Sequence, residues 1–165
     1  MKLGKVIFLD IDGVLALTQQ WGKDVYTPCG VMAYRFSPHC VSIFNEILEE
    51  TGAEIILTSD WKLFYDLHTM KCLFRWNEVS KGPVGFTADI YVEPKKLSEN
   101  IKPRKRANEI LDWLSRNQVD RYVVIDDLPL EAWFTPETFV RCKYEREGIS
   151  QAGLKEQIIK LINND

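Results

Sequence analysis

The chain has 165 residues, of which 45% are hydrophobic and 27% are charged, and its formal net charge is −3. This length and composition predict one soluble globular domain over residues 1–165. No apolar run approaches the roughly 20 residues that a transmembrane helix needs, so we expect no contact with a membrane. The net charge gives no general sign of a nucleic-acid-binding protein.

The N-terminal residues lead directly into an apolar segment and show no signal-peptide pattern, so we expect a cytoplasmic protein. Only His39 and His68 are present, so a histidine–cysteine zinc site has no support. We interpret His39 as a structural residue at a helix start and His68 as a residue on a helix surface. The four cysteines include no CxxC pair, and without a secretion signal we expect reduced thiols at all four positions: Cys29, Cys40, Cys72 and Cys142.

The unbroken apolar run from Val6 to Leu9 is typical of a strand that is buried on both faces. The remaining elements are predicted from apolar periodicity, caps and glycine or proline positions. In chain order we predict an irregular flap or hairpin over residues 16–36, a helix between Ser37 and Gly52, a strand over 53–57, a helix over 62–76, a loop or hairpin insertion over 81–101 with a possible strand at 86–92, a helix opened by Pro103, strands over 121–125 and 138–142, and a closing helix over 152–162.

Strands that alternate with helices predict an α/β fold. We expect a doubly wound, Rossmann-like parallel sheet with helices on both faces, and with the flap and hairpin as small insertions. In such sheets, ligands bind in the crevice outside the carboxyl ends of the strands. Polar residues at those ends are therefore the first candidates for a functional site.

Asp10 and Asp12 directly follow the first strand. In extended backbone, positions i and i+2 point to the same side, so both carboxylates are expected to face one spot. Gly13 allows a sharp turn just beyond them. Two carboxylates this close repel each other, and a bound Mg²⁺ would relieve that repulsion. The alternative is a strand end with two solvated acids.

Two other predicted strands end in polar residues, one in Thr58 and Ser59 and the other in Asp126 and Asp127. Between them lies a basic helix start that contains Lys102. Carboxylates that hold a metal, hydroxyls and a cation that hold phosphate oxygens, and one carboxylate left to attack together fit phosphoryl transfer.

The order of these motifs resembles the haloacid dehalogenase (HAD) superfamily of phosphohydrolases. The shared features are DxDGV after an apolar strand, a strand ending in Thr/Ser, Lys-Pro before a helix and a strand ending in Asp-Asp, and they span residues 5–162. More narrowly, ILTSDW at 56–61 and EILDWL at 109–114 look like the small HAD domains associated with RNA-repair proteins.

The resemblance implies a role for each motif residue. Asp10 would be the nucleophile that forms an aspartyl-phosphate. Asp12 would be the general acid and later the base, and its presence argues for phosphate rather than dehalogenase chemistry. Mg²⁺ would be held by Asp10, the backbone carbonyl of Asp12, Asp126 and Asp127. Thr58 and Ser59 would bind the phosphoryl group.

Two residues compete for the cationic role. The spacing from Lys102 to Asp126 is typical of the Lys-Pro version of the motif, so we prefer Lys102 as the phosphate-binding cation. Arg106 lies one helical turn further on the same face and is the alternative. A third reading is a solvated cationic helix start, because cations at a helix N-terminus oppose the macrodipole.

One further acid and four tryptophans are interpreted as structural residues. Asp60 is interpreted as the cap of the helix that follows it rather than as a site residue. The tryptophans at 61, 76, 113 and 133 are interpreted as packing residues rather than base-stacking platforms.

Neither insertion is long enough for the full cap domain of larger HAD enzymes, so we expect an open site. Such a site accepts a phosphorylated small molecule or a bulky substrate such as a polymer end. Residues 95–106 carry six cations against one anion, Glu99, which makes nucleic acid a hypothesis.

Two alternatives remain beside the phosphatase. One is a catalytically idle HAD-like module that binds phosphorylated polymers or proteins. The other is a phosphoacceptor receiver domain, which lacks support because no aspartate ends a suitable strand before Asp126. The patterns name neither the substrate nor the oligomeric state.

Overall fold

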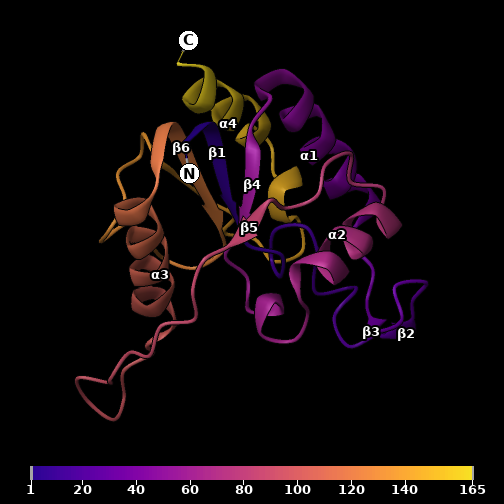
Figure 1. The fold of residues 1–165 in the computed structure, drawn as a ribbon, viewed down its shortest axis with the longest axis horizontal. Helices are drawn as coiled ribbons and strands as arrows, with labels where there is room; N and C mark the ends of the chain where they lie inside the picture. The colour runs from indigo at the N-terminus through magenta and orange to yellow at the C-terminus, as the bar shows by residue number, and fades with distance from the viewer. Residues whose placement is uncertain (1, 165) are drawn as a thin grey trace.

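A five-stranded parallel sheet in the order β5-β4-β1-β6-β7 forms the centre of the computed structural model, which describes residues 2–164 (Figure 1). The predicted α/β fold with a doubly wound, Rossmann-like sheet is confirmed. The central strand is the one that the apolar run predicted, and its last four residues are fully buried. The strands are β1 Lys2–Leu9, β4 Glu54–Leu57, β5 Gly85–Phe86, β6 Gln118–Asp126 and β7 Phe139–Arg141.

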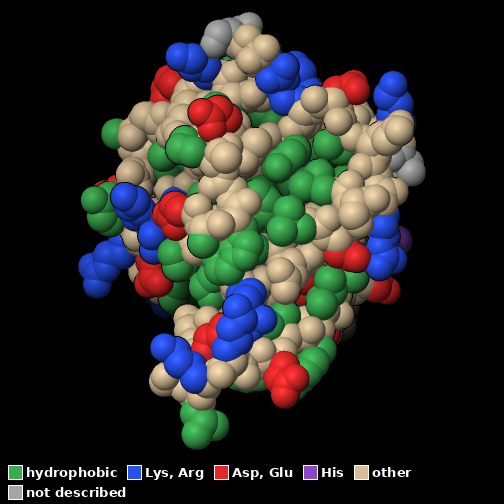
Figure 2. All heavy atoms as spheres, turned by 90° about the vertical axis from the view of Figure 1, so that its left-hand side faces the viewer, with side chains coloured by type: hydrophobic (Ala, Val, Ile, Leu, Met, Phe, Trp, Pro, Cys, Tyr) green, Lys and Arg blue, Asp and Glu red, His purple; other side chains and the backbone are tan. Residues whose placement is uncertain are grey.

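Within the described residues, helices cover both faces of the sheet (Figure 1), with three packed against one core cluster and one against the other. Ile7 and Leu9 of β1 face a core cluster that includes α1 Pro38–Thr51, α2 Leu67–Trp76 and α4 Leu154–Asn163. Val6 and Phe8 face the opposite cluster, which includes α3 Lys102–Arg116. Figure 2 shows this second face, where hydrophobic side chains remain visible because a single helix covers it incompletely.

Local caps decide which helix predictions succeed. The side chain of Ser37 accepts a hydrogen bond from the backbone N–H of Cys40, and Gly52 ends α1 in the left-handed conformation with φ of 63°. The helix predicted over residues 62–76 is wrong in its first half. A short 3-10 helix, η1 Asp60–Leu63, comes first, and Asp66 then caps α2 through the N–H of Thr69.

The two insertions carry only small strands. Residues 16–36 contain an antiparallel hairpin made of β2 Val25–Tyr26 and β3 Met32–Ala33, and we keep the name flap for this segment. The possible strand at 86–92 is reduced to the last residue of β5, and the chain then runs through a long projecting loop to α3 (Figure 1). A second 3-10 helix, η2 Gly148–Ser150, precedes α4. Over residues 2–164, every helix is too short or too polar to cross a bilayer.

The expectation of four reduced thiols is wrong for two of them. Cys29 of the flap and Cys72 of α2 form a disulfide, while Cys40 and Cys142 are buried free thiols. The partners are 43 positions apart in sequence, so no local pattern such as CxxC announces the pair. The bond attaches the flap covalently to the helix layer.

Breaking this bond should weaken the fold. The Cys29→Ser variant should lose about 2–4 kcal/mol of unfolding free energy, because a cross-link over a loop of this length restricts the unfolded chain. Chemical denaturation with and without reductant measures the loss. A Cys40→Ser variant controls for the loss of a thiol. Equal midpoints for oxidised and reduced wild-type protein would contradict the bond's contribution.

Candidate active site

The register of the parallel strands brings Asp10, Thr58 and Asp126 together at the carboxyl ends of the strands. Leu9 of β1 pairs with Leu57 of β4 and with Ile125 of β6, so the residues that follow these positions are neighbours. Two backbone hydrogen bonds continue the ladders, from Thr58 N to the carbonyl of Leu9 at 2.9 Å and from Asp10 N to that of Ile125 at 3.1 Å. The structure therefore brings the ends of all three strands together.

Asp10, Asp126 and Asp127 form a compact carboxylate cluster. One oxygen from each lies within 4.8 Å of the others. Burial, followed by the repulsion of neighbouring carboxylates, raises the pKa of Asp127, and burial likewise raises the pKa of Asp126. Gly13 borders the cluster on one side and has a φ of 81°. A Cβ at this position would collide with the Asp127 carboxylate, so the close approach requires glycine.

The donors of this cluster fit Mg²⁺. All are hard carboxylate oxygens, and a divalent cation would neutralise the negative charge that they gather in one buried place. Asp10, Asp126 and Asp127 would hold the ion. The carboxylate of Asp12 is engaged elsewhere, so Asp12 would contribute its backbone carbonyl, as the resemblance implied.

The carboxylate of Asp12 is held by two aromatic side chains that the sequence analysis did not assign to the site. Tyr34 of the flap donates its hydroxyl hydrogen to Oδ1 at 2.6 Å, and Trp61 donates its Nε1 hydrogen to Oδ2 at 3.1 Å. The two rings also pack edge to face, with centroids 5.0 Å apart. Burial raises the pKa of Asp12, although both hydrogen bonds act in the opposite direction. Trp61 is thus a packing residue, as interpreted, that also orients an acid.

Arg106, rather than Lys102, reaches the carboxylates. Its buried guanidinium forms an ion pair with Asp126 and lies 3.3 Å from Asp10 and 3.7 Å from Asp60. Burial alone would lower the pKa of Arg106, but these carboxylates raise it. Lys102 is the first residue of α3 and lies exposed at the rim of the same cavity. Lys102, which we preferred as the phosphate-binding cation, therefore lies at the rim of the cavity. Arg106, the alternative, lies next to the carboxylate cluster.

Two hydroxyls follow β4 in different environments. Thr58 is fully buried, and its Oγ1 has no hydrogen-bond partner among residues 2–164. A buried polar atom without a partner indicates that a group from outside the chain can bind there. Ser59 lines the cavity and caps η1 by accepting a hydrogen bond from Trp61 N at 3.4 Å. The cap that we assigned to Asp60 is therefore Ser59, and Asp60 instead faces Arg106.

The family model for the HAD domain in Swiss Army Knife RNA repair proteins matches residues 6–154. The chain belongs to this family. Searches of curated proteins and of solved structures found no match. Membership in the family indicates a HAD-type hydrolase. The matched residues include all the strand ends described above.

A buried ion pair lies next to the residues that follow β4. Lys62 Nζ lies 2.6 Å from Glu109 Oε2 of α3 and also donates to the carbonyl of Thr58 at 3.2 Å. Burial lowers the pKa of Lys62. The pair fixes the end of β4 against α3. Sequence reasoning missed it, because the two charges are distant in the chain and each is unremarkable in its own helix.

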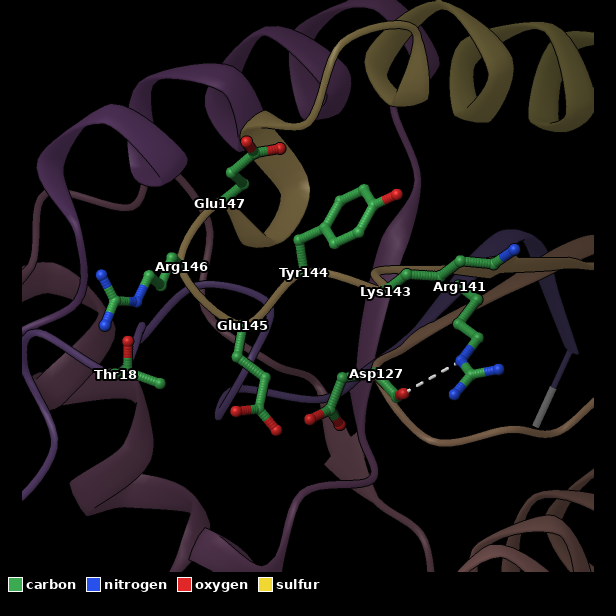
Figure 3. Close-up of a pocket in the computed structure, with 8 residues that line it drawn as sticks. All are labelled: Thr18, Asp127, Arg141, Lys143, Tyr144, Glu145, Arg146 and Glu147. Carbon is green, nitrogen blue, oxygen red and sulfur yellow. Dashed lines mark hydrogen bonds between the residues drawn. The ribbon is translucent and has the colours of Figure 1, made fainter.

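The HAD site opens into a cavity of about 350 Å³. A second hollow of about 710 Å³ adjoins it along the loop after β7 (Figure 3) and shares Asp127 and Glu145 with it. In Figure 3 the side chains of both residues extend to the same side of this loop, while Arg141 Nε donates to the carbonyl of Asp127 at 3.3 Å. The first cavity is lined by Asp10, Asp12, Trp21, Ser59, Asp60, Asn100, Lys102, Arg106, Asp127, Leu128 and Glu145.

Exchanging each candidate cation should separate their roles. Arg106→Gln should lower the free energy of unfolding by about 3–5 kcal/mol, because it leaves buried carboxylates without a counter-charge. Lys102→Gln should change it by less than about 0.5 kcal/mol, as expected for an exposed residue. Urea denaturation in the absence of divalent ions compares the two variants. A larger loss for Lys102→Gln would reverse the assignment.

Proposed function

We propose that this HAD domain is a Mg²⁺-dependent phosphatase that hydrolyses a phosphate monoester through an aspartyl-phosphate. The observation that carries the proposal is the meeting of Asp10, Asp126 and Asp127 beside a buried guanidinium and a threonine hydroxyl that has no partner within residues 2–164. An acid with a raised pKa, Asp12, lines the same cavity. These are the parts that attack on phosphorus requires.

In the first step, a carboxylate oxygen of Asp10 attacks the phosphorus atom. The bond from phosphorus to the ester oxygen breaks, and Asp12 gives that oxygen its proton, so the alcohol leaves neutral. Tyr34 and Trp61 hold the Asp12 carboxyl in place for this transfer. Arg106, which lies beside Asp10, and Thr58, whose buried hydroxyl has no partner among residues 2–164, would donate hydrogen bonds to the phosphoryl oxygens.

In the second step, the Asp12 carboxylate takes a proton from water. The resulting hydroxide attacks phosphorus, the bond to the Asp10 oxygen breaks, and inorganic phosphate leaves. Asp10 and the proton on Asp12 are thereby restored. When bound, Mg²⁺ would supply charge neutralisation between the carboxylates and the phosphoryl oxygens.

The end of a phosphorylated nucleic acid is the substrate that we favour over a small sugar phosphate. Family members occur in RNA repair proteins. The site cavity adjoins a second hollow, which leaves room for a polymer. The cationic segment 95–106 supports this less than its charge implies, because Arg104 pairs with Glu99 and Lys105 with Asp89.

A panel of phosphate esters tests the proposal, with and without Mg²⁺. It includes p-nitrophenyl phosphate, glycerol phosphate and oligonucleotides that carry a 3′- or a 5′-phosphate. We expect phosphate release that requires Mg²⁺ and is abolished by chelation. Undetectable release from every ester, together with measurable binding of a phosphorylated oligonucleotide, would favour the catalytically idle module.

Metal binding should depend on pH. The raised pKa values of Asp126 and Asp127 mean that the metal-free folded state holds more protons than the unfolded chain, so its stability falls as pH rises above the unfolded values. Mg²⁺ displaces these protons and should therefore raise the melting temperature more at about pH 8 than at about pH 5.5.

Asp127→Asn should stabilise the metal-free protein at about pH 8 by about 1 kcal/mol, allowing for solvent screening, and should remove most of the response to Mg²⁺. Asp120→Asn, an exposed residue at the other end of β6, is the matched control. An equal response to Mg²⁺ in both variants would contradict the proposed ligand set.

A further inference from the structure

Trp21 is tied to the loop that carries Asp12. Its indole Nε1 donates to the carbonyl oxygen of Ala16 at 2.9 Å, and the same oxygen accepts from Gly13 N at 2.8 Å. Ala16 also forms an isolated β-bridge with Asp12. The ring is half-buried and forms part of the wall of the site cavity. Its position relative to Asp12 is therefore fixed by backbone contacts.

This connection determines which part of a substrate meets the ring. In the proposed function, on which the inference rests, Asp12 gives its proton to the leaving oxygen. The leaving group must therefore lie on the side of the phosphorus that faces Asp12. Tyr34 of the flap donates a hydrogen bond to Asp12, so the flap lies on this same side. Trp21 belongs to the flap and lines the same cavity, so it borders the space of the leaving group.

The chemistry of this wall differs from that of the rest of the cavity. Apart from Leu128, the other lining residues are polar or charged. The one hydrogen-bonding group of the indole is already used, so the ring offers only its apolar surface. Part of the ring packs against the main core cluster, which holds it rigidly. A phosphoryl group fills only a small part of about 350 Å³, which leaves space beside the ring for a planar group.

We propose that Trp21 is a stacking platform for a nucleobase, so that the ester cleaved in this site belongs to a nucleotide or to the terminal nucleotide of a polynucleotide. Stacking on an aromatic ring accepts every base, because each base has a π-face. The residue would therefore select nucleotides over alkyl phosphates without reading their sequence.

The test compares the ratio of two kcat/KM values, one for adenosine 3′- or 5′-monophosphate and one for glycerol phosphate. In Trp21→Leu this ratio should fall about 5- to 150-fold, the range that follows from the loss of one base–aromatic contact. Trp21→Phe should keep most of the ratio, although it also loses the bond to Ala16. Trp133→Leu, which changes a half-buried tryptophan on the other face of the sheet, is the control for loss of packing.

The outcomes separate this inference from the proposed function. If the ratio is unchanged in Trp21→Leu, whether both kcat/KM values fall equally or neither falls, the ring has only a packing role. If wild-type protein hydrolyses neither substrate, the phosphatase proposal fails, and calorimetric binding of adenosine monophosphate then tests the platform alone. Weaker binding to Trp21→Leu than to Trp21→Phe supports it, and equal binding overturns it.

Discussion

The Asp10→Asn variant is expected to lose at least about 10⁴-fold in kcat for every phosphate ester that the wild-type protein hydrolyses, because an amide cannot replace the attacking carboxylate. The position offers no substitute nucleophile in the same geometry. The other carboxylates of its cluster are Asp126 and Asp127, and Asp126 is paired with Arg106. The loss should therefore appear in kcat more than in KM.

The matched control is Asp112→Asn, which removes a carboxylate from the outer side of α3, where it pairs with Arg116. It should retain wild-type kcat. Melting curves of both variants establish that each is folded. A complementary measurement is the trapping of labelled phosphate on the wild-type chain, in a linkage that hydroxylamine cleaves and that Asp10→Asn lacks. A kcat for Asp10→Asn within tenfold of the wild-type value would contradict the assignment of the nucleophile.

Residues that follow directly from strand ends were the ones that the sequence could place. Asp10, Thr58 and Asp126 come immediately after buried apolar runs. The carboxyl ends of adjacent parallel strands lie together, whatever path the chain takes between the strands. The same local logic located the start of α1 at Ser37. In each case the signal lies within a few residues of the feature that it predicts.

Features that depend on the path of a long connection were missed. Tyr34 reaches Asp12 only because the flap folds back over the end of β1, and the Cys29–Cys72 bond depends on the same path. The choice between Lys102 and Arg106 depends on where α3 begins and how it is rotated against β6. Because a difference of one turn leaves the apolar pattern of the helix unchanged, spacing alone could not decide between them.

Asp12→Asn is expected to slow hydrolysis of an alkyl phosphate by about 10²- to 10⁴-fold, the usual contribution of a general acid or base. The first turnover on p-nitrophenyl phosphate should be largely retained, because nitrophenolate leaves without a proton. The second step still needs Asp12 as the base. We therefore expect a burst of nitrophenolate followed by a slow steady state, and no burst of alcohol from glycerol phosphate. Equal loss of the first turnover on both esters would contradict the role of Asp12 as the acid.

Tyr34→Phe tests how that acid is tuned. The tyrosine hydroxyl stabilises the Asp12 carboxylate at 2.6 Å, and this lowers the pKa of Asp12 against the stronger effect of burial. Without the hydroxyl, the pKa of Asp12 should rise further. The group then stays protonated to higher pH, so the alkaline limb of kcat/KM should move upward by as much as about one pH unit, the equivalent of one hydrogen bond to a charged group.

Tyr65→Phe provides the comparison for Tyr34→Phe, because Tyr65 donates to the backbone carbonyl of Met32 on the same flap and not to a carboxylate. Both variants remove one hydroxyl that attaches the flap, so both should loosen it to a similar extent. Only loss of the Tyr34 hydroxyl changes the charge balance at Asp12. A shift of the alkaline limb in Tyr34→Phe alone would therefore assign the tuning to the hydrogen bond, whereas the same shift in both variants would assign it to flap motion.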